Sequence, residues 1–223
     1  MIGSNQRLFL RLIEFGLVES KASVFLDIGS GMGIPALHFS ALYDCLSLGI
    51  EIEYPLWLVS HANIKRVYKR AQEEGKILPQ VSFLLSSVLE LQTFDGIDII
   101  YSFDKLFGDE LLMGIAEIFN RSSSKVLISY HNLSRLTSLG FKDLALQGCQ
   151  TMEMVGSKEG KTAFIYTCRR KGAISIRSNE VDPIFKDTFI HFKNGTLVEK
   201  NKEMNVAELC PPRATRKRKN DNN

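Results

Sequence analysis

A glycine-rich turn directly after an apolar run constrains this chain more than any other feature. The run VFL at 24–26 leads into DIGSGMGIP, in which Gly29, Gly31 and Gly33 alternate with other residues. Glycines let a backbone bend sharply and bring its amides against a ligand with no Cβ in the way. A helix is expected from about Pro35, since proline is tolerated in a first turn. The order of strand, glycine turn and helix predicts the first unit of an open parallel sheet.

Short apolar strands alternate with amphipathic helices along most of the chain. Strands are expected at 23–28, 46–52, 81–86, 97–102 and 125–130, and helices at 5–17, 35–43, 55–74, 109–120 and 134–147. Two further strands, CQTMEMV and TAFIYTC, flank GSKEGK and are expected to close the sheet as an antiparallel hairpin. The fold class is therefore α/β, with a doubly wound, Rossmann-like, mostly parallel sheet of seven strands.

The sequence changes in character beyond Arg170. We expect a main domain at 1–170, a C-terminal appendage at 171–210 and a basic disordered tail at 211–223. In the appendage, FIHFKNGTLVE places Asn194-Gly195 between apolar alternations, which predicts a β-hairpin.

Composition excludes several classes of protein. No window approaches the roughly 20 unbroken apolar residues of a membrane span, and the N-terminus lacks the layout of a signal peptide. An intracellular protein with no membrane partner is expected. The four cysteines lie far apart with no CxxC pair, and His38 and His61 have no clustered acids, so neither disulfides nor a metal site is expected.

Positive charge is concentrated at the C-terminal end. Residues 211–223 hold five Lys or Arg against Asp221 alone, so they carry a net +4, while the rest of the chain sums to about −1. The cluster at 213–219 predicts nuclear import or contact with nucleic acid, and a merely solubilising terminus is the alternative. A second basic set, Lys65, Arg66, Lys69 and Arg70, is typical of a solvated helix face.

Two nucleoside cofactors fit the glycine turn, and charge separates them. Asp27 would repel the pyrophosphate of a nicotinamide dinucleotide, whereas it attracts the ammonium and sulfonium of S-adenosylmethionine. Glu51 ends the second strand, and its oxygens can accept both ribose hydroxyls of either ligand. S-adenosylmethionine is therefore favoured over a nicotinamide cofactor and over a turn that binds no cofactor.

The residues around this turn carry a resemblance to a known family. VFLDIGSGMGIPALHFSA followed by LGIEIE resembles the cofactor site of class I methyltransferases, in which a terminal antiparallel hairpin is also typical. Within that class the chain is most similar to the non-SET histone-lysine methyltransferases of the disruptor-of-telomeric-silencing type. The similarity covers roughly residues 5 to 170 and includes FLLSSVLEL and FGDELL. It implies a methyltransferase domain at 1–170, transfer of a methyl group to a lysine ε-amine, a histone or nucleosome as partner, and a nuclear protein of chromatin.

The resemblance also assigns the residues that bind the cofactor. The glycine turn matches the methionine-side loop, Glu51 matches the ribose acid, and Ser87 stands where the family has an acid near the adenine amino group. The expected set is Asp27, Gly29, Ser30, Gly31, Gly33, Glu51, Ser86, Ser87 and Val88.

The residues expected near the methyl-accepting substrate differ from those of the family. The family places an Asn pair after the fourth strand, where this chain has Phe103 and Asp104 in YSFDKLFG. Asp104 is expected to act as a general base on the substrate ammonium, and a surface pair with Lys105 is the alternative. Tyr101, Ser102 and Phe103 leave the same strand end and are expected to line the methyl channel, unless they belong to the core.

Other functions remain open on the sequence. His131 is either at the pocket rim or a capping histidine. A class I fold hosts many acceptors, so the alternatives are a methyltransferase acting on RNA, another protein or a small molecule, and an inactive chromatin reader that only binds the cofactor.

Overall fold

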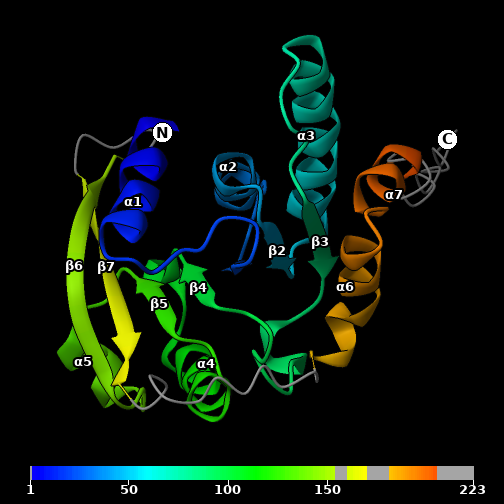
Figure 1. Ribbon diagram of the computed structural model, residues 1–223. Coiled ribbons are helices and arrows are strands. Elements are labelled where there is room, and N and C mark those ends of the chain that lie inside the picture. Colours follow the sequence, from blue (N-terminus) through cyan, green and yellow to red (C-terminus); the bar gives the residue numbers. More distant parts are fainter. Residues whose placement is uncertain (1, 154–159, 170–180, 205–223) are drawn as a thin grey trace, which may run out of the picture.

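A seven-stranded sheet forms the centre of the molecule (Figure 1). The structure is a computed structural model that describes residues 2–153, 160–169 and 181–204. The strand order is β3-β2-β1-β4-β5-β7-β6, with β1 to β5 parallel and with β7 antiparallel to both of its neighbours. The predicted α/β class, with a mostly parallel sheet and an antiparallel terminal hairpin, is therefore confirmed.

The elements follow one another in the predicted alternation as far as β5. The strands are β1 (Val24–Ile28), β2 (Leu46–Glu51), β3 (Val81–Leu85), β4 (Ile99–Ser102), β5 (Val126–Ser129), β6 (Leu144–Met152) and β7 (Lys161–Cys168). The helices are α1 (Ile2–Glu14), α2 (Ile34–Tyr43), α3 (Tyr54–Glu73), α4 (Asp109–Arg121), α5 (Leu133–Ser138), α6 (Lys186–Lys193) and α7 (Leu197–Glu203).

Residues of β1 alternate between two cores, one on each face of the sheet. Leu26 and Ile28 pack on the face that also buries α4, whereas Phe25 packs against the other face, where its ring stacks on Phe39 of α2 at 4.4 Å between centroids. Asp27 is two residues after Phe25 and therefore lies on the α2 face, at the carboxyl end of the strand. The period of the strand thus decides which way the acid points.

The predicted helix at 134–147 is wrong in its second half. The helix α5 ends at Ser138, Gly140 takes a φ of 95° and Asp143 a φ of 57°, and β6 begins at Leu144. Two left-handed residues in four stop a right-handed helix, so the chain turns and enters the sheet.

The predicted hairpin at Asn194-Gly195 is also wrong. Asn194 is the C-cap of α6, and Gly195, with a φ of 69°, leads into α7. A glycine at positive φ serves a helix end as well as it serves a hairpin turn, so the dipeptide alone does not distinguish them. The tail at 211–223 lies outside the described residues, and the division of the chain into three regions stays a prediction.

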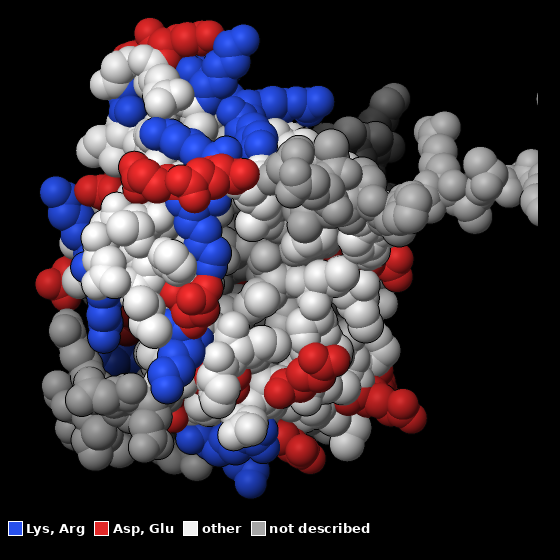
Figure 2. All heavy atoms as spheres, turned by 90° about the vertical axis from the view of Figure 1, so that its right-hand side faces the viewer, with Lys and Arg blue, Asp and Glu red and all other residues white. Residues whose placement is uncertain are grey.

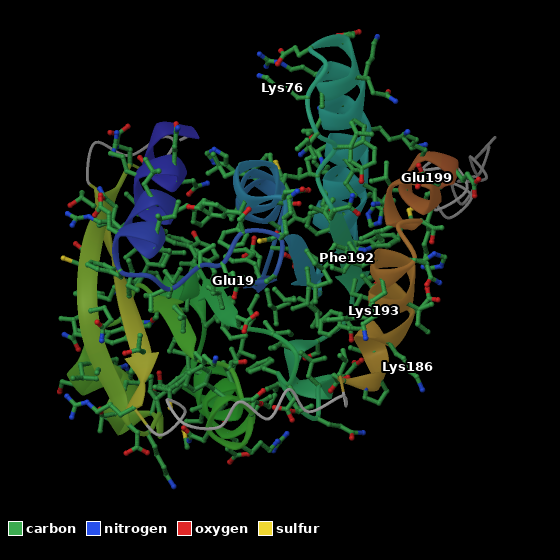
Figure 3. The ribbon with its side chains drawn as sticks, viewed as in Figure 1. Glu19, Lys76, Lys186, Phe192, Lys193 and Glu199 are labelled. Carbon is green, nitrogen blue, oxygen red and sulfur yellow. The ribbon has the colours of Figure 1, made fainter. Side chains whose placement is uncertain are left out.

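The helices α6 and α7 pack beside β3 and α3 (Figure 1). Thr188 Oγ1 lies 3.1 Å from Ser82 Oγ of β3, and Asn201 Nδ2 donates to Tyr68 OH of α3 at 3.0 Å and to Val81 O of β3 at 2.8 Å. Figure 3 shows Phe192 on the side of α6 that faces the sheet, where it packs against the core. The described part of the C-terminal segment is therefore built into the body of the fold.

Charges of both signs stand together on this side of the molecule. Figure 2 shows Lys and Arg interspersed with Asp and Glu over the face that carries α3, α6 and α7. The four basic residues predicted on α3 are exposed, and Arg70 Nε donates to Glu74 Oε1 at 2.7 Å. This arrangement is typical of a solvated helix face. None of the described helices combines the length and the hydropathy that crossing a bilayer requires.

Candidate active site

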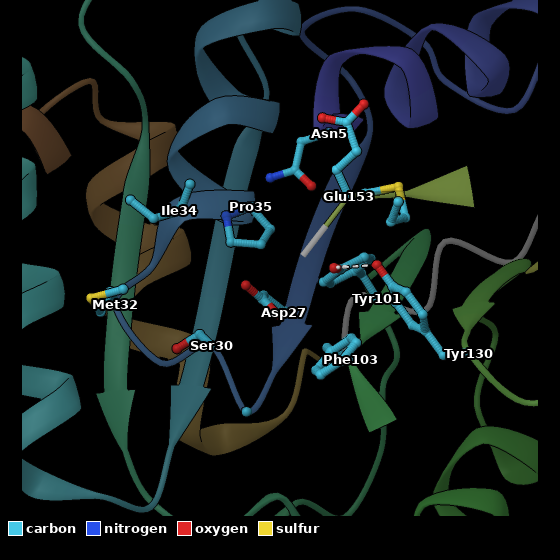
Figure 4. Close-up of a pocket in the computed structure, with 12 residues that line it drawn as sticks. Asn5, Asp27, Ser30, Met32, Ile34, Pro35, Tyr101, Phe103, Tyr130 and Glu153 are labelled. Carbon is cyan, nitrogen blue, oxygen red and sulfur yellow. Dashed lines mark hydrogen bonds between the residues drawn. The ribbon is translucent and has the colours of Figure 1, made fainter. Parts of the chain in front are cut away.

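A cavity of about 280 Å³ opens at the carboxyl ends of β1, β4 and β5 (Figure 4). The strand order reverses between β1 and β4, and this is where open α/β sheets hold their ligands. The start of α2 forms one wall, and α1 and the end of β6 form another. The lining residues are Asn5, Asp27, Gly29, Ser30, Met32, Ile34, Pro35, Tyr101, Phe103, Tyr130, Met152 and Glu153.

The glycine turn takes the conformation that its sequence requires. Gly29, Gly31 and Gly33 have φ of 69°, 53° and 77°, which side chains disfavour. A Cβ at Gly33 would lie 2.3 Å from Phe83 Cζ of β3, so this glycine also allows close packing. A Cβ at Gly31 would meet nothing within 4 Å, which leaves the approach to the turn open.

Asp27 is the buried acid of the cavity. Its side chain is 1% exposed, and no donor among the described residues reaches its Oδ2. Burial, with a smaller contribution from the negative charge of Glu51, raises the pKa of Asp27 well above its usual value. The hydroxyl of Ser30 likewise has no described partner. Buried polar atoms without partners are costly unless a ligand satisfies them, so this corner of the cavity suits a cationic group that donates hydrogen bonds.

Glu51 holds the glycine turn and is not among the residues that line the cavity. Its Oε2 accepts from Gly31 N at 2.7 Å and its Oε1 accepts from Glu53 N at 2.9 Å. Each carboxylate oxygen keeps a further lone pair, so Glu51 can still accept from a ribose while it holds the turn.

The predicted adenine-side residues follow β3 and do not line the cavity. Ser86 Oγ donates to Glu90 Oε2, Ser87 Oγ accepts from Leu89 N at 3.2 Å and caps a short 3-10 turn, and Val88 is buried in the core. Exposed apolar side chains stand at or after the ends of β2, β3 and β4, namely Ile52, Leu85, Leu89 and Leu106. None of these four was predicted as a site residue, although Ile52 directly follows Glu51.

Asp104 is neither in the cavity, as a general base would be, nor on the surface beside Lys105. It is 3% exposed, so the predicted surface pair with Lys105 is wrong. Its Oδ1 accepts from Tyr130 N at 2.8 Å, and its Oδ2 accepts from the hydroxyl of Ser129. Burial raises the pKa of Asp104, and these two hydrogen bonds oppose the rise. Asp104 is not among the cavity residues, and its geometry favours a role in joining β4 to β5 over that of a base.

The other three candidates divide by the alternation of β4. Tyr101 and Phe103 line the cavity, whereas Ser102 faces away and donates from Oγ to Ile28 O at 3.2 Å. His131 lies beside Asp104, with Nε2 at 3.2 Å from Asp104 O, and it does not line the cavity either.

The structure adds Tyr130, which the sequence analysis missed. The hydroxyls of Tyr101 and Tyr130 lie 3.2 Å apart inside the cavity, and the ring of Phe103 packs edge-on against Tyr130 at 4.7 Å between centroids (Figure 4). Tyr130 directly follows β5, as Phe103 directly follows β4. The parallel order of these neighbouring strands was therefore the signal that could have identified it.

The N-terminal helix closes the far side of the cavity. Arg7 Nη2 donates to Glu153 Oε1 at 2.9 Å, and Glu153 N donates to Ser4 Oγ at 3.2 Å, which holds Asn5 of α1 over the opening (Figure 4). Asn5 and Glu153 are far apart in the sequence, and no sequence pattern predicts that they line the same cavity. Within the described ranges, no group of His, Cys, Asp and Glu could hold a metal ion.

No protein-family model matches the chain. Among curated proteins, the chain is 29% identical over 115 residues to the histone-lysine N-methyltransferase, H3 lysine-79 specific, of Dictyostelium discoideum. The match covers 50% of this chain and 6% of that much longer protein.

Solved structures agree with the topology. Magnesium protoporphyrin IX methyltransferase from Synechocystis, solved with bound S-adenosylmethionine, is 14% identical, with a TM-score of 0.52 over 74% of this chain and 78% of that one. TrmN from Thermus thermophilus is 15% identical, with a TM-score of 0.51 over 73% of this chain and 47% of that one. The chain has the fold of the class I S-adenosylmethionine-dependent methyltransferases.

Proposed function

We propose that this chain is an S-adenosylmethionine-dependent methyltransferase whose acceptor is a protein lysine, with histones as the favoured substrate. The observation that carries the proposal is the unpartnered oxygen of Asp27, buried where the glycine turn meets the carboxyl end of β1. A carboxylate in this position attracts a cation and repels a pyrophosphate.

The residues around the turn fit this cofactor. Asp27 and Ser30 would receive its ammonium group, the open approach to Gly31 would admit its methionine part, and Glu51 would accept from its ribose. The exposed apolar side chains at or after the ends of β2, β3 and β4 offer a surface for an adenine ring. The cofactor supplies a methyl group on a positively charged sulfur, and the protein's part is to hold both reactants in line within a dry cavity.

The lining of the cavity supports an amine acceptor. It contains two acids, Asp27 and Glu153, of which Glu153 is paired with Arg7, and no Lys, Arg or His among the described residues. Such a lining disfavours an anionic acceptor, and the rings of Tyr101, Phe103 and Tyr130 suit the apolar stem of a lysine side chain. The similarity to a histone-lysine methyltransferase over half the chain supports the same choice. On this proposal the basic cluster at 213–219 would contact nucleosomal DNA or direct the protein to the nucleus.

The proposal is tested first by binding. We expect calorimetry to detect S-adenosylmethionine binding to the wild type and a loss of about tenfold or more in Asp27→Asn, since the variant cannot offer a charge to the ammonium. Asp44→Asn is the matched control, because Asp44 is at the far end of α2 with a φ of 54°, which Asn tolerates. A wild type that does not bind the cofactor, or an Asp27→Asn variant that binds it equally well, would contradict the proposal.

The acceptor is tested by transfer of a radiolabelled methyl group to free histones, nucleosomes and total RNA. Label on histone lysine is the expected result. Label on RNA alone would keep the cofactor and overturn the acceptor, and binding without label on any of the three would favour a cofactor-binding reader.

A further inference from the structure

Two tyrosine hydroxyls inside the cavity have only each other as described partners. Tyr101 is 4% and Tyr130 2% exposed, and their hydroxyl oxygens lie 3.2 Å apart. Around them the cavity is largely apolar, with Phe103, Met152 and Pro35 nearby in the lining. The bond between them uses only one of the two O–H hydrogens, so the pair keeps hydrogen-bonding capacity that faces the cavity and can serve a ligand.

The hydrogen-bonding capacity of the pair can be counted. Each hydroxyl has one hydrogen and two lone pairs, and one hydrogen is used between the two oxygens. One O–H hydrogen and three lone pairs remain. Burial raises the pKa of Tyr130 to about 12, so the hydroxyls stay protonated at neutral pH and act as neutral acceptors.

We propose that the paired hydroxyls of Tyr101 and Tyr130 receive the acceptor amine and accept one N–H hydrogen each, which makes Tyr130 a residue that determines acceptor specificity. This inference rests on the proposed function. With both N–H groups held by the two oxygens, and with the remaining O–H hydrogen turned away from the nitrogen, the lone pair of a neutral primary amine is left free to point toward the methyl group. A secondary or tertiary amine cannot fill both acceptors.

The proposed reaction needs no base in the cavity. The amine loses its proton to solvent before it enters, its nitrogen forms a bond to the methyl carbon as the carbon–sulfur bond breaks, and the electron pair of that bond stays on sulfur. The product leaves as a methylammonium ion. Asp104 is then a positioning residue, because it binds the backbone N–H of Tyr130 and so fixes where that hydroxyl lies.

The placement of the pair also predicts the extent of methylation. After one transfer the amine has a single N–H left in its neutral form, so one of the two oxygens loses its partner. We therefore expect the wild type to produce mainly monomethylated lysine, and Tyr130→Phe to shift the product toward dimethyl-lysine while it transfers more slowly.

The experiment compares Tyr130→Phe and Tyr101→Phe with Tyr43→Phe as the control. Tyr43 is on α2, outside the cavity, and its buried hydroxyl also has no described partner, so its removal should change nothing measured here. The ligands are n-butylamine, its N-methyl and its N,N-dimethyl derivatives, as mimics of the lysine side chain. Saturation-transfer NMR measures their binding to the protein alone and to protein saturated with S-adenosylhomocysteine.

We expect the wild type to prefer n-butylamine over the dimethyl derivative, and each cavity variant to lose about tenfold in n-butylamine affinity, the size of one hydrogen bond to a ligand. Calorimetry with S-adenosylhomocysteine should give the same affinity for both cavity variants and for the wild type, and mass spectrometry reports the product states.

Equal amine binding and equal product states in Tyr130→Phe and the wild type would overturn the inference and leave the proposed function intact. Failure of the wild type to bind S-adenosylhomocysteine would instead overturn the proposed function. The amine preference of the unliganded protein would still decide the role of the two hydroxyls.

Discussion

At the scale of single residues, the buried carboxyl of Asp27 lowers the stability of the ligand-free protein and at the same time provides a binding site for a cation. Its carboxyl is buried without a described partner for Oδ2, which favours the neutral form in the ligand-free protein. Because the folded pKa is raised above the unfolded value, the stability that this group contributes is fully present below the unfolded pKa and is lost as pH rises through the folded pKa. A bound cation would reverse the preference by stabilising the carboxylate.

We therefore expect S-adenosylmethionine affinity to rise with pH through the raised pKa of Asp27. The charge that acts on Asp27 is that of Glu51. Burial and, to a smaller extent, the charge of Asp27 raise the pKa of Tyr101 and of Tyr130, so both tyrosines stay protonated and neutral over the range tested. Calorimetry between pH 5 and 9 measures the profile. Asp27→Asn should flatten it and should also raise the melting temperature of the ligand-free protein at neutral pH. A wild-type affinity independent of pH would contradict this account.

Asp104 is expected to act on stability first. Asp104→Ala leaves the N–H of Tyr130 without its acceptor inside the core, and should lower the free energy of unfolding by about 3 kcal/mol. Asp104→Asn keeps an oxygen for that N–H and should cost clearly less. Urea denaturation of both variants measures the difference. If the two variants lose activity and keep wild-type stability, Asp104 belongs to the reaction after all.

At the scale of elements, the glycine turn and the strand ends determine the site. Asp27, Tyr101 and Phe103 could be predicted from the sequence because each lies at the end of a short apolar strand, where ligand sites in parallel sheets occur. The predicted place of Asp104 was wrong, because the residues after β4 turn back toward β5 and leave the alternation of the strand. Asn5 and Glu153 come from distant elements, and only the packing of α1 against β6 brings them to the cavity.

The wrong helix at 134–147 and the wrong hairpin at 194–195 have one physical cause. Gly140 and Gly195 both take positive φ, which ends a helix and also builds a hairpin. At 194–195 the burial of Phe185 and Leu197 in the core decides in favour of helices on either side. A local pattern identifies the turn in such cases, and tertiary packing decides which elements flank it.

Two substitutions in the glycine turn distinguish the cost of a left-handed backbone from the cost of a steric clash. Gly31→Ala should cost about 1 kcal/mol, because its φ is left-handed and nothing lies near the new methyl group. Gly33→Ala has the same left-handed strain and also places its methyl group 2.3 Å from the ring of Phe83, so it should destabilise the protein by about 1 kcal/mol more than Gly31→Ala does. Thermal unfolding of the two variants checks the order, and equal losses would show that Phe83 yields without cost.

At the scale of the whole molecule, the segment from Val181 to Met204 contributes to the main core. Asp182 Oδ2 accepts from the backbone N–H groups of Gln92 and Thr93, and Phe185 and Leu197 are buried among residues of the sheet. The region that was predicted to be an appendage therefore packs closely against the main domain in its described part.

A pair of truncations tests how far the fold extends. A chain that ends at residue 170 loses these contacts and should melt at a lower temperature and precipitate more readily than the full chain. A chain that ends at residue 204 keeps every described contact and is the control. Equal melting temperatures for the two truncations would support an independent domain at 1–170.

The two edges of the sheet are shielded by different means. At β3 the side chain of Asn201 occupies the backbone carbonyl of Val81. At β6 the pairing with β7 shifts register between Leu146 and Gly148, and the ring of Phe15 lies where a side chain at Gly148 would stand. A capped carbonyl and a bulge both interrupt the row of free backbone groups to which a strand of another molecule could hydrogen-bond. The fold thus carries its own protection against edge-to-edge aggregation.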